Sequence, residues 1–206
     1  GMESSPLISA YVALGMAEML DSGYTVDENA LENGLRYLRD QMETLEGDQT
    51  LSPVVRSNRQ AFMLYTLARH GVYYFALIDR LYEQRLTLSL HARAFLAQTI
   101  HLLNAQDERA KTLLAELEAA AKLCASGASW EAQDPDPWNW NTDTRTTAIV
   151  LHALAQIDPQ SGLTVNGVRW LMLHRRSGCW QSTQETAWAL TALANWLEAS
   201  GELKAR

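Results

Sequence analysis

Helical segments of two kinds alternate along the chain, and this alternation constrains the fold more than any other feature. Apolar residues recur every three to four positions, whereas the alternation of period two that is typical of strands is almost absent. We predict helices over residues 7–21, 27–43, 58–69, 72–85, 88–104, 107–123, 143–157, 164–175 and 182–199. The sequence therefore predicts an all-α fold.

The odd-numbered helices of this series are apolar nearly all round, as in AFMLYTLA at 61–68 and TAIVLHALA at 147–155. Most even-numbered ones are amphipathic, and in the helix at 107–123 one face carries Leu113, Leu114 and Leu117. A helix that is apolar on all sides is buried on all sides, and an amphipathic helix covers it. We therefore predict an inner and an outer layer of helices.

Internal repeats support the two layers. TRTTAIVLHALA at 144–155 aligns without gaps to TQETAWALTALA at 183–194, on inner helices, and NGLRYL at 33–38 matches NGVRWL at 166–171, on outer ones. The repeating unit is an αα-hairpin arranged around an axis, which allows an open solenoid or a closed α/α toroid. We favour the toroid, because the inner helices are too apolar to line an open groove.

The chain is predicted to form one domain over residues 3–206, which is incomplete on its N-terminal side. Gly1 and Met2 look like the remnant of a cleaved tag and a start codon. A toroid of six hairpins has twelve helices, and the predicted series is shorter and begins on an inner helix. We therefore expect about three helices to precede residue 1 in the parent protein.

Composition and charge exclude several classes of protein. The net charge of −7 argues against nucleic-acid binding, which needs a dense basic face. No uncharged apolar run reaches 18 residues, so we expect no transmembrane span, and no signal peptide is visible. Cys124 and Cys179 define neither a disulfide framework nor a metal site, and we predict no metal and no cofactor.

The Trp- and Asp-rich stretch at 130–145 is the best candidate for an exposed binding site. Trp130, Asp134, Asp136 and Trp138 are weak surface-site candidates, since aromatic rings with paired carboxylates suit a sugar ligand. The alternative, which we favour, is a structural loop, because each of the two aspartates precedes a proline. In that interpretation Trp140 is a hydrophobic plug that corresponds to Trp180 in the next repeat.

The stretch GCWQSTQE at 178–185 raises the question of a reactive cysteine. Cys179 precedes a helix, a position that lowers a thiol pKa, but a small residue in a tight turn is the simpler interpretation. Ser182 with Glu185 forms the spacing of a capping box, as Thr25 with Glu28 does earlier. His152, within an apolar helix, is predicted to be a core histidine.

The residues 163–197 (LTVNGVRWLMLHRRSGCWQSTQETAWALTALANWL) resemble the closing hairpin of the thioester domain of the alpha-2-macroglobulin and complement family. The segment 9–38, which contains Ala-Tyr-Val, looks like that family's Thr-Ala-Tyr-Val helix and the hairpin after it. Among the members of this family, the bacterial ones resemble these segments most. The apolar helices alone are less specific, because prenyltransferases and terpene cyclases use related toroids.

The resemblance implies a non-enzymatic part of a bacterial macroglobulin-like protease inhibitor. In that family, bait cleavage exposes a buried Cys–Gln thioester that acylates the target. The implied partners are the other domains of the parent and, through it, target proteases, and the implied location is periplasmic or extracellular. The alternative function is a carbohydrate-active or glycan-binding toroid that uses residues 130–145.

The family's reactive motif, Gly-Cys-Gly-Glu-Gln, is absent from this sequence. Cys124 lies in Leu-Cys-Ala-Ser and Cys179 in Gly-Cys-Trp-Gln. We expect the motif before residue 1 in the parent, or a parent that lacks it. The stretch 46–60, which corresponds to the place of a histidine that assists acyl transfer in some complement proteins, contains no histidine. A thioester in the parent would then favour amines over hydroxyls.

Overall fold

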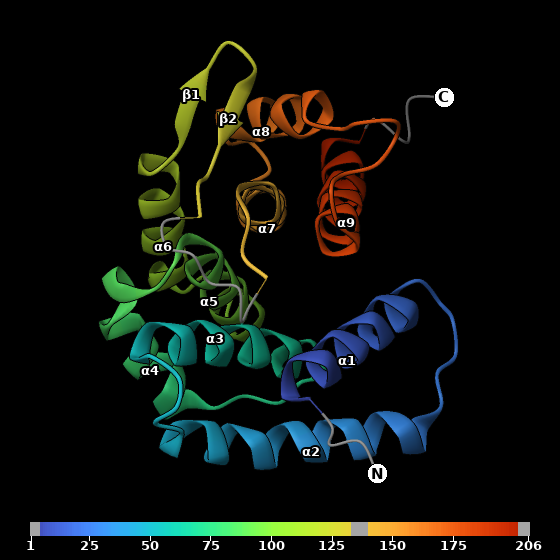
Figure 1. Ribbon diagram of the computed structural model, residues 1–206, viewed down its shortest axis with the longest axis vertical. Coiled ribbons are helices and arrows are strands. Elements are labelled where there is room, and N and C mark those ends of the chain that lie inside the picture. Colours follow the sequence, from blue (N-terminus) through green and yellow to red (C-terminus); the bar gives the residue numbers. More distant parts are fainter. Residues whose placement is uncertain (1–4, 133–139, 202–206) are drawn as a thin grey trace.

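The computed structural model describes residues 5–132 and 140–201, which form helices and one short β-hairpin (Figure 1). The elements are α1 (Pro6–Asp21), α2 (Glu28–Gly47), α3 (Pro53–Arg69), α4 (Phe75–Glu83), the 3-10 turn η1 (Arg85–Thr87), α5 (Leu90–Leu103), α6 (Glu108–Ala119), β1 (Lys122–Cys124), β2 (Gly127–Ser129), α7 (Asp143–Ile157), α8 (Gly162–Leu173) and α9 (Thr183–Ser200). None of the described helices combines the length and the apolar character needed to cross a bilayer.

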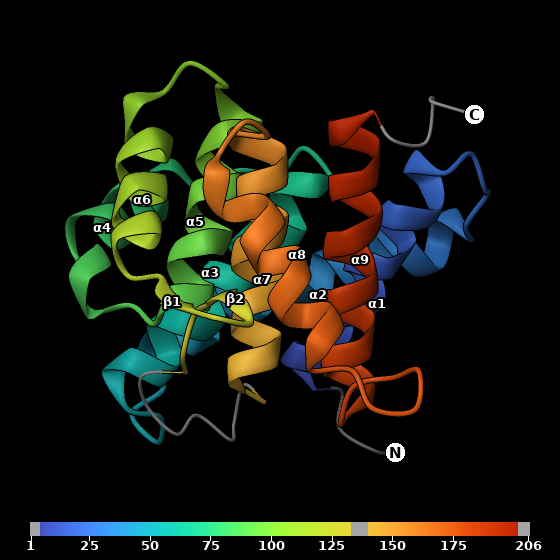
Figure 2. The same ribbon diagram turned by 90° about the horizontal axis from the view of Figure 1, so that it is seen from above.

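The helices form the two layers that the sequence predicted. The inner helices α1, α3, α5, α7 and α9 follow one another around an arc, and each of them from α3 to α9 packs against the previous one. Helices α2, α4, α6 and α8 lie on the outside of this arc (Figures 1 and 2). The arc is open on one side, between α1 and α9 (Figure 1).

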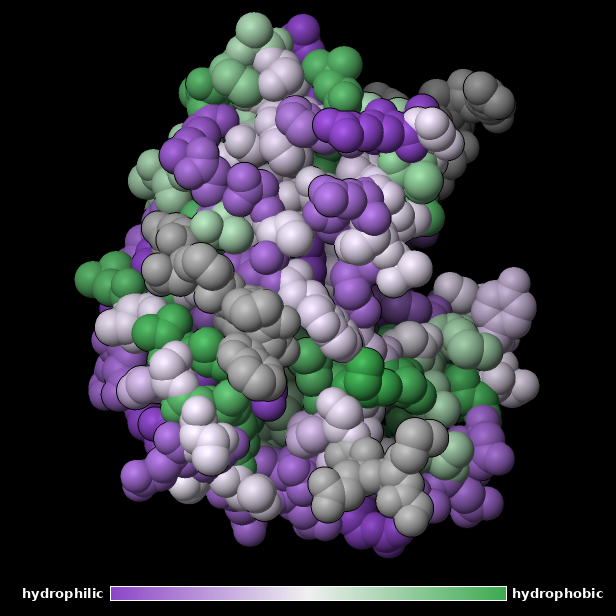
Figure 3. Space-filling view, in the orientation of Figure 1, coloured by the Kyte–Doolittle hydropathy of each residue, from purple (hydrophilic) through white to green (hydrophobic). Residues whose placement is uncertain are grey.

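The core is centred on α3, α5 and α7, whose buried faces run almost without interruption, as at Leu64, Phe95 and Leu151. The prediction of all-round burial is wrong for α1 and α9, where Val12 is 54% exposed and Leu190 is 56% exposed. Leu190 lies on α9 at the open side of the arc, where no further helix covers it and the surface is hollowed (Figure 3). Val12 lies instead in a shallow groove between α1 and α2.

Ser182 caps a helix as expected, whereas the Glu185 carboxylate, which a capping box would return to the cap N–H, accepts from the Thr142 hydroxyl over 2.7 Å. The backbone N–H of Glu185 donates to the Ser182 hydroxyl over 3.1 Å, so Ser182 caps α9. The prediction at Thr25 is wrong, because α2 is capped by Asp27, whose carboxylate accepts from the N–H of Ala30 over 2.9 Å. A carboxylate directly before the first helical residue caps as well as a hydroxyl does, and it adds a favourable charge at the helix N-terminus.

The helix predicted over 107–123 is shorter, and an unpredicted hairpin follows it. Strands β1 and β2 pair antiparallel, with Cys124 opposite Gly127. Gly127 has a φ of +127°, and a Cβ there would lie 2.2 Å from the carbonyl oxygen of Asn166 on α8. The hairpin therefore lies directly against the backbone of α8, and only glycine permits this approach.

Candidate functional site

Trp130 is not a surface residue, contrary to the prediction. Its side chain is wholly buried, and its indole Nε1–H donates to the carbonyl of Leu117 over 2.6 Å. Its backbone N–H donates to the hydroxyl of Thr147 over 2.9 Å. The ring fills the space between the end of α6 and the start of α7, so it offers no face to a sugar. The other candidates, Asp134, Asp136 and Trp138, lie outside the described residues.

Trp180 makes the same two contacts one repeat later. Its Nε1–H donates to the carbonyl of Leu171 over 3.0 Å, and its backbone N–H donates to the hydroxyl of Thr186 over 3.3 Å. Thr147 and Thr186 are matching positions of the repeat. The plug that corresponds to Trp180 is therefore Trp130.

The prediction that Trp140 is this plug is wrong. Trp140 is 38% exposed, has a φ of +53°, and lies with its ring centroid 5.8 Å from that of Tyr11. The sequence comparison failed because the two plugs lie at different distances from their inner helices: Trp130 is 17 positions before Thr147 (147 − 130), whereas Trp180 is 6 positions before Thr186 (186 − 180). Trp140, which is 7 positions before Thr147 (147 − 140) and precedes a similar polar run, was therefore taken for the counterpart of Trp180.

The two cysteines are both exposed and free, and their surroundings differ. Cys179 closes a tight turn, in which it exchanges two backbone hydrogen bonds with Arg176, as the turn interpretation predicted. The Cys124 sulfur lies 2.9 Å from the Ser126 hydroxyl, and hydrogen bonds from Ser126 lower the pKa of the Cys124 thiol. Within the described residues, neither sulfur has a histidine as a hydrogen-bond partner.

A buried polar group that the sequence analysis missed lies at the N-terminal ends of the inner helices. We call Tyr11, His91, Arg145 and Trp188 the ring-end cluster. The Tyr11 hydroxyl accepts from Arg145 Nη2 over 2.9 Å and from Trp188 Nε1 over 3.4 Å. Arg145 is only 1% exposed, and its Nε and Nη1 have no hydrogen-bond partner in the described part of the chain.

The charges around Arg145 do not form a direct ion pair with it in the described residues. Burial holds the pKa of His91 well below its usual range, and repulsion from Arg145 lowers it further, so His91 is neutral. The buried Glu185 accepts instead from the Thr142 hydroxyl over 2.7 Å. Two donors of a buried guanidinium are thus left to hold a carbonyl or carboxylate oxygen.

One signal could have revealed this cluster. Arg145 lies in the first turn of a helix whose next ten residues include one histidine and otherwise small, hydroxyl or apolar side chains. An arginine in the first turn of such a helix lies either in the core or at the surface. The repeat did not distinguish these two places, because the matching position is Gln184.

His152 is a core histidine, as predicted. It is wholly buried, and burial, followed by the nearby Arg69, lowers its pKa to about 3. Its Nε2 lies 3.3 Å from the Gln156 side-chain nitrogen, and its ring makes edge contacts with Tyr65 and Trp188. Its position inside the apolar ring gives it a structural role.

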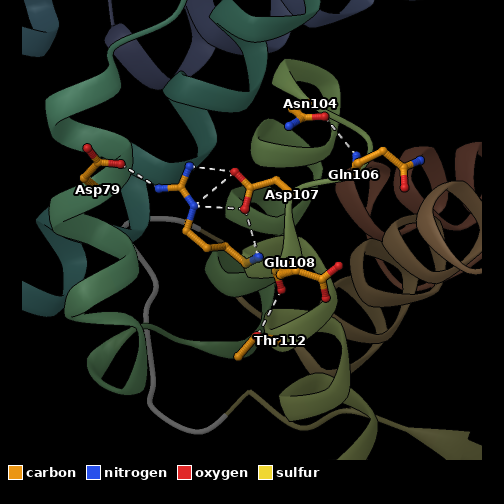
Figure 4. A network of polar contacts seen from close by, with 7 residues as sticks. Asp79, Asn104, Gln106, Asp107, Glu108 and Thr112 are labelled. Carbon is orange, nitrogen blue, oxygen red and sulfur yellow. Dashed lines mark hydrogen bonds and ion pairs between the residues drawn. The ribbon is translucent and has the colours of Figure 1, made fainter.

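A polar network on the outer layer is also structural (Figure 4). Arg109 donates from Nη1 to Asp79 of α4 over 2.6 Å and from Nη2 to Asp107, the N-cap of α6, over 2.7 Å. Hydrogen bonds from Arg109 lower the pKa of Asp107. The network ties two outer helices together on the surface.

These features define a two-layer all-α domain with an open arc of inner helices, in which apolar packing, aromatic plugs and helix caps account for most of the sequence motifs. The sequence profile of the A-macroglobulin TED domain matches residues 1–196. The chain therefore belongs to the A-macroglobulin TED domain family. No curated protein sequence matches it.

Several solved bacterial structures contain a similar fold. Salmonella alpha-2-macroglobulin reacted with methylamine matches with a TM-score of 0.72 and 17% identity, over 94% of this chain and 12% of that one. Escherichia coli alpha-2-macroglobulin activated by porcine elastase matches with a TM-score of 0.72 and 15% identity, over 94% and 17%. A native E. coli structure that runs from domain MG7 to the C-terminus matches with a TM-score of 0.68 and 15% identity, over 95% and 30%. The chain thus spans less than a third of each matched protein.

Proposed function

We propose that this chain is the helical-ring part of a bacterial macroglobulin-like protease trap and that it catalyses no turnover of its own. The observation that carries this proposal is the family match over residues 1–196, on a fold shared with bacterial alpha-2-macroglobulins. The parent acts once, by covalent capture of a protease. It works in the periplasm or outside the cell, where such a target is met.

The reactive thioester lies outside this chain in our proposal. The sequence has two cysteines, and neither Cys124 nor Cys179 lies in a Gly-Cys-Gly-Glu-Gln motif. Both are exposed, one at the end of β1 and the other in a tight turn. A thioester needs shielding from water until it reacts, so neither environment suits it. The partner that supplies the reactive group is another part of the parent protein.

The open side of the arc is the place where that part docks. A largely apolar groove between α1 and α9, lined by Leu14 and Trp188 among others, lies on this side, and Leu190 of α9 is exposed. Arg145 lies close by, joined through the Tyr11 hydroxyl to Trp188 of α9, with two hydrogen-bond donors unused in the described residues. A segment that brings apolar residues and one acceptor oxygen would satisfy both features.

The carbohydrate alternative loses one of its supports, because the buried Trp130 offers no stacking surface. Its other residues are untested, and glycan binding by the chain, measured before and after alanine replacement of Asp134 and Asp136, decides that question. We retain the protease trap as the function and no second candidate.

The experiment that tests the proposal uses the full parent protein. Treatment with methylamine should add one methylamine in mass, and the Cys124→Ser and Cys179→Ser variants should take up as much as the unchanged protein. Loss of the adduct in either variant would place the thioester in this chain. Because residues 46–60 contain no histidine, we also propose that amines react faster than glycerol, and equal rates would contradict that preference.

A further inference from the structure

A large polar cavity lies at the end of the ring opposite to the ring-end cluster. We call it the ring-floor cavity; its volume is about 700 Å³. Its lining residues come from the last turns of α1, α3, α5 and α7 and from one side of α9. Gln156, which lines it, is eleven positions after Arg145 on α7, or about 16 Å along the helix. The cavity therefore lies away from Arg145, although Leu190 on its α9 wall also borders the open side of the arc.

Helix ends give this cavity a negative potential. Four inner helices end around it, at Asp21, Arg69, Leu103 and Ile157. The last carbonyls of a helix lack partners within the helix and carry the negative end of its dipole. No basic residue lies in the last turn of α1, α7 or α9. The converging dipoles are therefore only partly compensated.

The side chains add to this negative charge. Glu18, Asp21 and Glu198 line the cavity, against a single guanidinium, that of Arg69. Arg69 donates to Glu18 over 2.6 Å and to Asp21 over 2.5 Å, and its own side chain is only 9% exposed. Glu198 has no ion pair within the described residues. Arg69 thus pairs with Glu18 and Asp21, and the carboxylate of Glu198 is left for a ligand.

One hydrogen-bonding atom in the wall of the cavity has no partner within the described residues. His101 lines the cavity, and burial lowers its pKa, so its ring is neutral. Its Nδ1 is buried and has no hydrogen-bond partner in the part of the chain that the structure describes. A neutral histidine nitrogen can accept a hydrogen bond, so the site suits a ligand that donates.

The size and the side chains favour an organic cation over a metal ion. A volume of about 700 Å³ lies within the range of small-molecule sites. Among the described residues, no group of three or more His, Cys, Asp or Glu is arranged to hold a metal. We propose that the ring-floor cavity binds a small alkylammonium ligand of the polyamine type, whose ammonium groups lie toward Glu198 and toward the Glu18–Asp21 pair.

Calorimetric titration of the chain with spermidine at low salt tests this site. We expect saturable binding of one molecule, which weakens as salt is added. The variant Glu198→Gln should raise the Kd about tenfold, since it replaces a charged hydrogen bond by a neutral one. The matched control is Glu32→Gln on α2, which makes the same change in net charge at an exposed position away from the cavity and should leave the Kd within about twofold of the unchanged chain.

Three results would overturn the proposal. The first is no saturable binding of spermidine at millimolar concentration. The second is an equal loss of affinity in Glu198→Gln and Glu32→Gln, which would mean attraction by the net charge alone. The third is equal binding of Mg²⁺ or of the neutral 1,8-octanediol, which would mean that the ammonium groups are not recognised. None of these results bears on the thioester, so the test is independent of the proposed function.

Discussion

Replacement of Trp130 by alanine is the sharpest test of the repeat that organises this fold. The indole is wholly buried between α6 and α7, and its Nε1–H is bonded to the Leu117 carbonyl. Truncation of a buried Trp or Phe to alanine costs about 3–5 kcal/mol. A carbonyl that is left buried without its donor costs roughly 1–3 kcal/mol more, unless water enters the space. A domain stability of about 5–15 kcal/mol would lose roughly a quarter or more.

Two further variants separate the contributions. Trp130→Phe keeps an aromatic ring but removes the donor to Leu117, and we expect a loss of about 1–3 kcal/mol. The control is Trp140→Phe, which changes a partly exposed ring of the same type and should cost about 0.5 kcal/mol or less. Urea unfolding followed by circular dichroism gives each free energy of unfolding. A loss of less than about 1 kcal/mol in Trp130→Ala, or equal losses in Trp130→Phe and Trp140→Phe, would refute the assignment of the plug.

Two other predictions concern stability. Because the pKa of His152 is about 3 in the folded chain and near 6.5 unfolded, the unfolded state binds more protons as the pH falls through 6.5. This group alone should lower the free energy of unfolding by about 1.6 kcal/mol between pH 6.5 and 5, and the buried His91 adds to the fall. Urea unfolding measured across this pH range gives the dependence of the unfolding free energy on pH. If the variant His152→Gln showed the same dependence, His152 would not be its source. Gly127→Ala should cost more than about 1 kcal/mol, because its Cβ would collide with Asn166. Gly34→Ala, a helical position with open space, should instead stabilise the chain by about 0.5–1 kcal/mol, and thermal melts of both variants test the contrast.

The layer of each helix could be predicted from the sequence because burial on all sides and burial on one face leave different patterns. The frame shared by 144–155 and 183–194 fixed two inner helices, and Leu38 and Leu171, at matching positions of the outer repeat, are both wholly buried. The exposure of α1 and α9 could not be predicted, since an apolar residue type, as at Leu190, does not indicate whether another helix covers the side chain. The β1–β2 hairpin was missed for a similar reason: its glycine is required by the backbone of α8, a contact between residues far apart in the sequence.

The candidate sites were harder to predict than the fold. Trp130 was taken for a surface residue because it begins a stretch rich in charges and prolines, while its burial depends on a space between α6 and α7. The Ser182 cap followed from local spacing alone, so it was predicted. The ring-floor cavity is assembled from helix ends that are as far apart in sequence as Glu18 and Glu198, and no local pattern connects them.

Intact-mass measurement of methylamine-treated protein tests the central claim most directly, namely that this chain is the ring of a macroglobulin trap whose reactive group lies elsewhere in the parent. The chain itself should keep its mass, and the full parent should gain one methylamine at a residue outside these 206 positions. An adduct within this chain, or a parent that gains none and forms no covalent complex with a protease, would contradict the account.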